Sequence, residues 1–247
     1  MEPQTTIGLA HFIGQTDAIG KTLLVLLLLM SMATWYLIVA KAVQAARTGM
    51  YTKQFLSAFW GAPSVQAVAS HLEREQPREP FSRLAAHAIT AARHHRRHVA
   101  KTLDEGGTEA DFLTRSIRRV IDEETARCES GLTTLASIGS TAPFIGLFGT
   151  VWGVYHALVN IGMSGQGTLD KVAGPVGEAL IMTALGLAVA VPAVLAYNCA
   201  VRRNRVFLSR LDSFAHDLYA LLTTGSALGE VEQQAQAPQS ALAGAGA

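Results

Sequence analysis

Three polar residues stand in two otherwise apolar stretches in the second half of the chain. Thr150 follows "GLFG", while Glu178 and Thr183 lie within "GPVGEALIMTALGLAVAVPAVLAYN", residues 174–198. An acid within an apolar span usually faces a bundle interior or a water cavity, where it moves ions or protons. Hydroxyl groups can line such a path. These residue types predict the movement of protons or ions rather than bond-making chemistry.

Glu178 also allows a second interpretation. Residues 179–201 form 23 uncharged positions, which is about 34 Å of helix and enough to span a bilayer without the glutamate. Glu178 would then be a solvated acid at the outer interface, favoured by the helix dipole in the first turn. The residues alone leave both interpretations open.

The two threonines are expected at matching depths in the membrane. Thr150 comes 21 residues after Glu129, and Thr183 comes 19 residues before Arg202, so their depths agree within about 3 Å. Two hydroxyls at one depth could line a polar path, or each could bond to the carbonyl four residues back in its own helix. His156 could titrate in such a path, although its position near the helix end favours an interfacial histidine.

Enzymatic chemistry is not expected. The chain contains no phosphate loop, nucleophile elbow or zinc-hydrolase motif. The run "HHRRH" at residues 94–98 has no carboxylate or thiol beside it, so a solvated basic face is favoured over a metal site. A net charge of +1 gives no case for nucleic-acid binding. The sequence predicts no enzyme, no metal and no cofactor.

The helices that must position these residues are membrane spans. Hydrophobic residues make up 49% of the chain and charged residues only 16%, against about 25% in soluble domains. Apolar stretches at residues 23–40, 132–161 and 176–201 are each long enough to cross a bilayer. Residues 41–131 hold 14 of the 20 Lys and Arg, and the chain after Val201 holds four more. Because positive charge stays cytoplasmic, the N-terminus is expected outside.

These patterns predict an all-α membrane protein with eight segments. They are an external N-terminal segment (1–20), transmembrane helix 1 (21–43), a cytoplasmic helical domain (44–131), transmembrane helix 2 (132–161), an external hairpin (162–174), transmembrane helix 3 (175–201), a cytoplasmic helix (202–224) and a disordered tail (225–247).

The content of small residues differs between the three spans and indicates which of them pack together. Gly, Ala, Ser and Thr are frequent in the second and third spans, whereas the first is leucine-rich all round. Tight helix contacts in lipid depend on small side chains, so the second and third spans are expected to pack together while the first faces lipid. The residues expected to shape this packing are Gly146, Gly149, Gly153, Pro143, Gly186 and Pro192.

Two spans are expected to continue into the cytoplasm as long rods. Residues 109–161 could form one helix of about 80 Å, because apolar residues recur at helical spacing. Beyond the third span, an apolar seam with coiled-coil-like spacing follows, at Phe207, Leu211, Phe214, Leu218 and Leu221. The seam could meet a partner helix or this chain's own loop helices.

The stretches "STAPFIGLFGTVWGVYHALVNI" (140–161) and "VAGPVGEALIMTALGLAVAVPAVLAYN" (172–198) resemble the signature of the ExbB/TolQ proton-channel family, which is distantly related to MotA flagellar stators. The resemblance covers about residues 130–200. "SGQGTLDKVAGPVGEAL" favours the ExbB branch, and His156 is similar to the TolQ branch. A flagellar stator is disfavoured because only three spans are found.

The resemblance implies a ring of subunits, typically a homopentamer, in the bacterial inner membrane. Its pore encloses single-span helices of an ExbD- or TolR-like partner, and proton flow works a TonB-like transducer or TolA. Thr150, Glu178 and Thr183 match the family's polar pore positions. TonB-dependent transport of siderophores and vitamin B12 is the implied function; a Tol-Pal subunit or a non-conducting membrane scaffold is the alternative.

Overall fold

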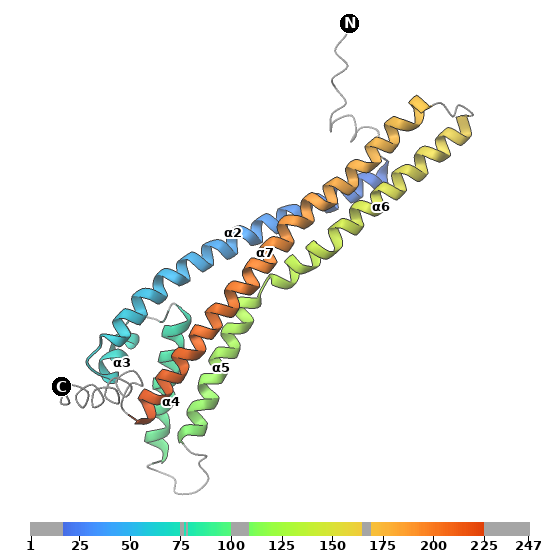
Figure 1. Cartoon of the computed structure of the whole chain (residues 1–247). Helices are drawn as coiled ribbons and strands as arrows, with labels where there is room; N and C mark the ends of the chain where they lie inside the picture. Colours follow the sequence, from blue (N-terminus) through green and yellow to red (C-terminus); the bar gives the residue numbers. More distant parts are fainter. Residues whose placement is uncertain (1–16, 75–76, 78, 100–108, 165–168, 225–247) are drawn as a thin grey trace, which may run out of the picture. The chain divides into compact units, whose positions relative to one another are not determined.

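The computed structural model of the chain describes residues 17–74, 77, 79–99, 109–164 and 169–224. These residues form six helices and, within the described ranges, no strand (Figure 1). The helices are α2 (Ala18–Trp60), α3 (Val65–Arg74), α4 (Pro80–Val99), α5 (Glu109–Glu129), α6 (Leu132–Ser164) and α7 (Leu169–Thr224). The expectations for residues 1–16, for residues 165–168 of the hairpin and for the tail lie outside the described residues, whereas residues 162–164 and 169–174 of the expected hairpin belong to α6 and α7.

Three helical stretches are long and apolar enough to cross a membrane. They lie within Ala18–Trp60, Ala110–Met163 and Ala179–Thr224. The first two contain the apolar stretches 23–40 and 132–161, and the third contains residues 179–201 of the stretch 176–201. The expectation of an all-α chain with three helices able to span a bilayer is therefore confirmed.

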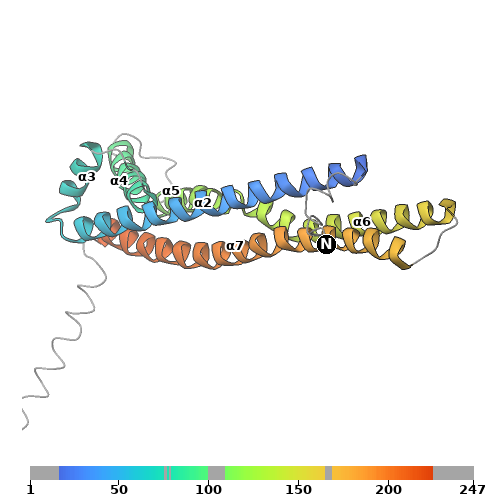
Figure 2. The ribbon, with the colours of Figure 1, turned by 90° about the horizontal axis from the view of Figure 1, so that it is seen from above.

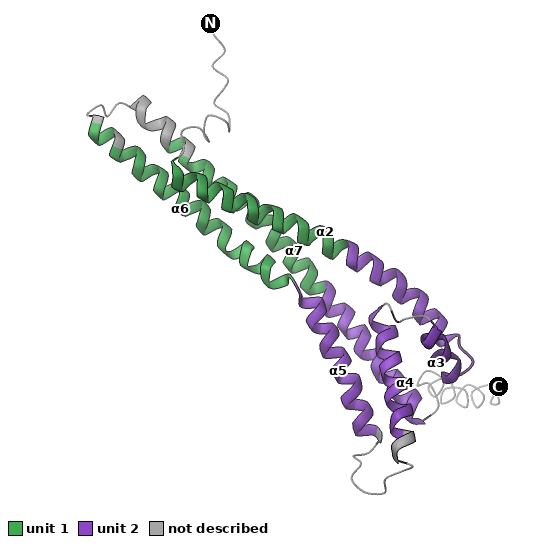
Figure 3. Ribbon diagram, turned by 180° about the vertical axis from the view of Figure 1, so that it is seen from behind, with its two compact units in different colours: residues 1–42, 131–202 green, residues 43–130, 203–247 purple. Residues whose placement is uncertain are grey.

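The chain divides into two compact units, coloured separately in Figure 3. Unit 1 comprises residues 1–42 and 131–202, and unit 2 comprises residues 43–130 and 203–247. Helices α2 and α7 each contribute one part to unit 1 and the other part to unit 2. Unit 1 holds the apolar spans, and unit 2 holds most of the charges.

In unit 1, α6 lies beside the first part of α7 (Figures 1 and 2). The buried cluster of this unit draws on all three spans, with Leu27 from α2 only 2% exposed. The other buried members are Leu135, Ile138, Ala142, Met182, Val189, Ala190 and Ala193. Helix α2 thus has a side that packs as well as a side that is exposed.

The expectation that the first span simply faces lipid is therefore wrong for one side of α2. Thr34 is 1% exposed, and its hydroxyl donates a 2.9 Å hydrogen bond to the Met30 carbonyl. A hydroxyl satisfied within its own helix can be buried at little cost. Other large apolar side chains of the span, namely Leu23, Leu24, Met30 and Leu37, are partly buried against the same cluster. Those on the opposite side are exposed, at Val25, Leu26, Leu28, Leu29, Met32, Trp35, Tyr36 and Val39. A leucine-rich sequence hides this asymmetry because leucine suits both lipid and a protein core.

Unit 2 is built around the apolar seam of α7. Leu211 and Leu218 are fully buried, and Phe214 is 4% exposed. The Phe214 ring lies 5.1 Å from that of Phe59 on α2 and 5.4 Å from that of Phe81 on α4. Of the two partners that the sequence left open for the seam, the structure shows the chain's own helices.

Glu79 joins two helices of unit 2 and is 4% exposed. Its carboxylate accepts hydrogen bonds from the backbone N–H groups of Phe81 and Ser82, which caps the start of α4. The Thr52 hydroxyl of α2 donates a third bond at 3.0 Å. Burial raises the pKa of Glu79 above its usual value of 4.5, although these bonds act in the opposite direction.

The single rod expected over residues 109–161 is interrupted. Helix α5 ends at Glu129 and α6 begins at Leu132, with Gly131 between them at φ 78°. That left-handed conformation suits glycine because it has no Cβ. The Asn204 side chain donates a 2.8 Å bond to the Cys128 carbonyl and so satisfies one of the exposed carbonyls at the end of α5. The apolar periodicity continues across the break, which is why it suggested one helix.

Candidate functional site

The site begins with a close contact between the backbones of α6 and α7. A Cβ atom at Gly146 would lie 2.7 Å from the Met182 carbonyl oxygen and 3.1 Å from Cα of Gly186. A Cβ atom at Gly186 would lie 2.7 Å from the Ala142 carbonyl oxygen. Backbone atoms cannot move aside as a flexible side chain can. Glycine is therefore required at both positions for this approach.

The contact continues along both helices. A Cβ atom at Gly149 would lie 2.8 Å from Cε of Met182, and one at Gly153 would lie 3.0 Å from Cβ of Ala179. Gly139, which the sequence interpretation did not name, faces Val194 in the same way at 2.6 Å. Pro143 lies inside α6 and Pro192 inside α7, and neither ends its helix.

The two threonine hydroxyls meet within this contact. Oγ1 of Thr150 lies 2.5 Å from Oγ1 of Thr183, and either oxygen can be the donor. The Thr150 hydroxyl also lies 3.1 Å from the Gly146 carbonyl and 3.2 Å from the Ala179 carbonyl. Thr150 therefore makes the local bond within its own helix and also a bond to the neighbouring helix. The depth estimate from the sequence agrees with this placement.

The hydroxyl pair can relay hydrogen bonds but cannot hold a charge by itself. Each threonine hydroxyl has one proton and two lone pairs, so the pair can donate and accept in either direction. Both side chains are half-buried in the single chain, which leaves part of each surface available to water or to another helix. Net proton movement requires a titratable group beside them.

Glu178 is the acid that the sequence placed near this pair. Its backbone belongs to α7, five residues before Thr183. Its side chain lies outside the described part of the structure. The proposed role of Glu178 in a proton path therefore stays a prediction.

A second polar cluster, which the sequence interpretation missed, lies at the start of α2. Oδ1 of Asp17 accepts a 2.8 Å bond from the Gly20 N–H, and Oδ2 accepts a 2.6 Å bond from the Trp152 indole N–H of α6. Nε2 of His156 lies 3.7 Å from Oδ2. Aspartate just before an apolar run signals a helix cap. Its bond to Trp152, 135 residues later, has no sequence signal.

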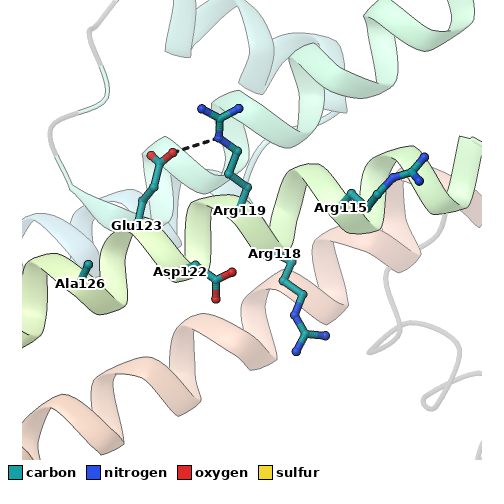
Figure 4. Close-up of a pocket in the computed structure, with 6 residues that line it drawn as sticks. All are labelled: Arg115, Arg118, Arg119, Asp122, Glu123 and Ala126. Atoms are coloured by element: carbon teal, nitrogen blue, oxygen red, sulfur yellow. Dashed lines mark hydrogen bonds and ion pairs between the residues drawn. The ribbon is translucent and has the colours of Figure 1, made fainter.

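One shallow hollow lies on α5 in unit 2 (Figure 4). Charged side chains line it, and Nε of Arg119 lies 3.1 Å from Oε1 of Glu123 one helical turn away. Exposed pairs of this kind contribute little to stability. The described residues contain no group of three or more His, Cys, Asp or Glu side chains that could hold a metal ion. The hollow is therefore a solvated helix face.

Comparison with known proteins identifies a protein family that matches this chain. Residues 77–213 match the model of the MotA/TolQ/ExbB proton channel family. The chain is 43% identical over 211 residues to the biopolymer transport protein ExbB of Xanthomonas campestris pv. campestris, covering 85% of this chain and 83% of that protein. It is 44% identical over 205 residues to the ExbB protein of Neisseria meningitidis, covering 80% and 89%.

The similarity to a TolQ protein covers less of the chain than the similarity to the ExbB proteins does. The Tol-Pal system protein TolQ of Pseudomonas aeruginosa is 42% identical over 110 residues, which is 44% of this chain and 48% of that protein. The ExbB matches extend over most of the chain, as the ExbB-like hairpin sequence suggested. A family of channels also agrees with the expectation that the chain is not an enzyme.

Proposed function

Because the chain belongs to the MotA/TolQ/ExbB proton channel family, we propose that it is the ExbB-like channel subunit of a TonB-type motor in a bacterial inner membrane. The motor uses the proton motive force to energise outer-membrane transport of siderophores and vitamin B12. The observation that carries the proposal is the Thr150–Thr183 hydroxyl pair between two glycine-rich helices.

The proton path in this proposal needs an acid from a partner. Thr150, Glu178 and Thr183 line the pore, and a carboxylate on an ExbD-like single-span helix passes each proton across the hydroxyl pair. A proton crossing the membrane field releases about 2.3 kcal/mol per 100 mV, which is the energy available to move a TonB-like transducer. The hydroxyls guide the proton without holding a charge in the apolar interior.

The ring in this proposal is a homopentamer, and the exposed surface of α6 supports assembly. Large apolar side chains on one face of this helix are exposed in the single chain, namely Phe144, Leu147, Phe148, Val151, Tyr155 and Leu158. Lipid or a neighbouring subunit can cover such a face. The distribution of Lys and Arg supports a periplasmic N-terminus and a cytoplasmic C-terminus.

The first experiment measures ferric-siderophore uptake in cells that lack their own ExbB. The cells receive this chain with its native ExbD- and TonB-like partners, as wild type, Thr183→Val or Thr183→Ser at matched membrane abundance. Valine keeps the size of threonine but removes the hydroxyl, whereas serine keeps the hydroxyl. We expect uptake with wild type and Thr183→Ser and at least a tenfold loss with Thr183→Val, about the effect of 1.4 kcal/mol on a barrier.

The result would separate three functions. Equal uptake with wild type and Thr183→Val would show that the Thr183 hydroxyl is not part of the path and would favour a non-conducting scaffold. The TolQ similarity supports one further candidate, a subunit of the Tol-Pal envelope system. If the chain restores detergent resistance to cells lacking TolQ but no siderophore uptake to cells lacking ExbB, the TonB assignment is wrong.

A further inference from the structure

Asp17 forms a clasp between the start of α2 and the outer part of α6, both in unit 1. Each of its carboxylate oxygens has its own donor: the Gly20 N–H at 2.8 Å and the Trp152 indole N–H at 2.6 Å. The first bond is a helix cap, which serine or asparagine could also make. The second bond needs a second acceptor oxygen, which asparagine lacks, on a side chain longer than that of serine. Capping alone therefore does not explain an aspartate here.

The other side chains of the clasp reinforce the bond to Trp152. The His156 ring lies 4.9 Å from the Trp152 ring, and its Nε2 is 3.7 Å from the Asp17 carboxylate. Burial raises the pKa of Asp17, but the bonds from Trp152 and Gly20 and the charge of His156 lower it more, so it lies below its usual value of 3.8. The carboxylate is thus ionised at neutral pH and is a strong acceptor for the indole.

Trp152 lies on a different side of α6 from the residues that contact α7. It follows Thr150 by two positions, which is about 200° around the helix. Its neighbour Gly153 does face α7, with the position of a Cβ atom 3.0 Å from Cβ of Ala179. The clasp therefore holds α6 from a direction other than the α7 contact.

The Asp17–Trp152 bond adds a second restraint to the one that the α7 contact supplies. Gly146 and Gly186 meet through backbone atoms, and the side chains of Met182 and Val194 lie against Gly149 and Gly139, so this contact restrains the rotation of α6 about its axis from one side only. The hydroxyl pair depends on that rotation, because the distance from Thr150 to Thr183 is short. A bond outside the glycine contact can fix the angle.

We propose that Asp17 is a positioning residue that sets the rotation of α6 through Trp152 and so keeps Thr150 facing Thr183. Its effect on proton transport rests on the function proposed above, whereas its effect on the helix contact does not. Asp17 touches neither threonine, and it acts by restraining the helix that carries one of them.

The test measures the rotation of α6 by disulfide formation in the full-length chain, assembled with its native partners in membranes. Gly153→Cys with Ala179→Cys places the thiols at the observed contact, and Val154→Cys with Ala179→Cys places one thiol about 100° further around α6. Cys128 and Cys199 are replaced by serine. The ratio of the two oxidation rates reports the rotation, because disulfides need closely placed Cβ atoms.

Three variants are compared in each cysteine background at matched abundance. Asp17→Ser keeps an acceptor for the Gly20 cap but is too short to reach Trp152. Trp152→Phe keeps the ring and removes the donor. Trp35→Phe is the matched control, because this tryptophan of α2 is 57% exposed. We expect the ratio to fall at least about threefold in Asp17→Ser and Trp152→Phe, as loss of a charge-assisted bond predicts, and to stay unchanged in Trp35→Phe.

The double variant Asp17→Ser with Trp152→Phe should fall no further than either single variant, because one bond is lost in each case. An unchanged ratio in Asp17→Ser or in Trp152→Phe would overturn the proposal. Siderophore uptake is measured in the same cells without the added cysteines. A fall in the ratio combined with no dependence of uptake on the chain would contradict the proposed function while leaving the positioning role of Asp17 in place.

Discussion

The two units of this chain are packed by opposite kinds of residue. In unit 1, α6 and α7 approach through glycine, and a Cβ atom at Gly146 or Gly186 would lie 2.7 Å from a backbone oxygen. In unit 2, the centre is a group of large side chains, and the Phe214 ring lies 5.1 Å from that of Phe59 and 5.4 Å from that of Phe81. Both units reach nearly complete burial at their centres.

The difference follows from the surroundings of each unit. Removing apolar area from water is favourable in free energy, so the most buried positions of unit 2 are aromatic and aliphatic. Lipid tails are as apolar as the side chains, so moving a side chain from lipid into a helix contact gains no such free energy. Helices in a membrane therefore associate through close backbone approach and hydrogen bonds. The hydroxyl pair of unit 1 belongs to this second kind of packing. Four substitutions test the comparison in order of expected effect, and a fifth, at Asp17, tests the sign of the last one.

Phe214→Ala should have the largest effect on stability. Removing a 4% exposed ring leaves a cavity that should cost unit 2 about 3–5 kcal/mol. Thermal unfolding of the purified chain in detergent, with hydrogen exchange to resolve unit 2, measures the loss. Met50→Ala is the control, because Met50 is 60% exposed and its replacement should change stability by less than about 0.5 kcal/mol. Equal effects would show that the aromatic group does not stabilise unit 2.

Gly186→Ala should have the next largest effect, confined to unit 1. One added carbon would meet the Ala142 carbonyl oxygen, and separating the helices should cost about 1–3 kcal/mol and weaken the threonine pair. Thermal stability and siderophore uptake should both fall. Gly162→Ala, with nothing within 4 Å of the added carbon, is the control and should gain up to about 1 kcal/mol. Full activity of Gly186→Ala would contradict backbone packing.

Gly149→Ala should be milder than Gly186→Ala, although its added carbon would also lie within 3 Å of another atom. The nearest atom is Cε of Met182, the end of a flexible side chain, and Cβ and Cγ of the same residue follow at 3.2 Å, whereas Gly186→Ala would meet a backbone oxygen at 2.7 Å. We expect a loss below about 1 kcal/mol in the same thermal assay. A loss equal to that of Gly186→Ala would mean that Met182 is as fixed as the backbone.

Glu79 should give the smallest effect, visible as a pH dependence of unit 2. Its pKa is raised in the folded chain, so the folded state binds the proton more tightly than the unfolded state does. Its contribution to stability is therefore fully present below about pH 4.5 and is lost as the pH rises through the folded pKa. Relative to Glu79→Gln, the wild type should gain melting temperature on acidification from pH 7 to 4.5.

The opposite sign is expected for Asp17 in unit 1, where the folded pKa is lowered. Its contribution to stability is present above about pH 3.8 and is lost as the pH falls through the folded pKa. Relative to Asp17→Asn, the wild type should lose melting temperature on acidification. The same slope for Glu79 and Asp17 would show that one of the two environments is wrongly described.

Much of the fold could be predicted because the signals are local. Long apolar runs bounded by charged residues indicated the three helices that can span a membrane. The break at Gly131 was missed, because the apolar pattern continues on both sides of this single glycine. The lipid-facing interpretation of α2 failed for Leu27 and Thr34, because a leucine-rich helix does not reveal which side is packed.

The sequence by itself determined the membrane class, the family resemblance and the depth of Thr150 and Thr183, since hydropathy and 1.5 Å per residue depend only on order along the chain. Tertiary structure decided that the two hydroxyls bond to each other, that Gly146 meets Gly186, and that Asp17 reaches Trp152. Those contacts depend on how each helix is turned about its axis. That rotation is set by residues distant in sequence, so no local pattern records it.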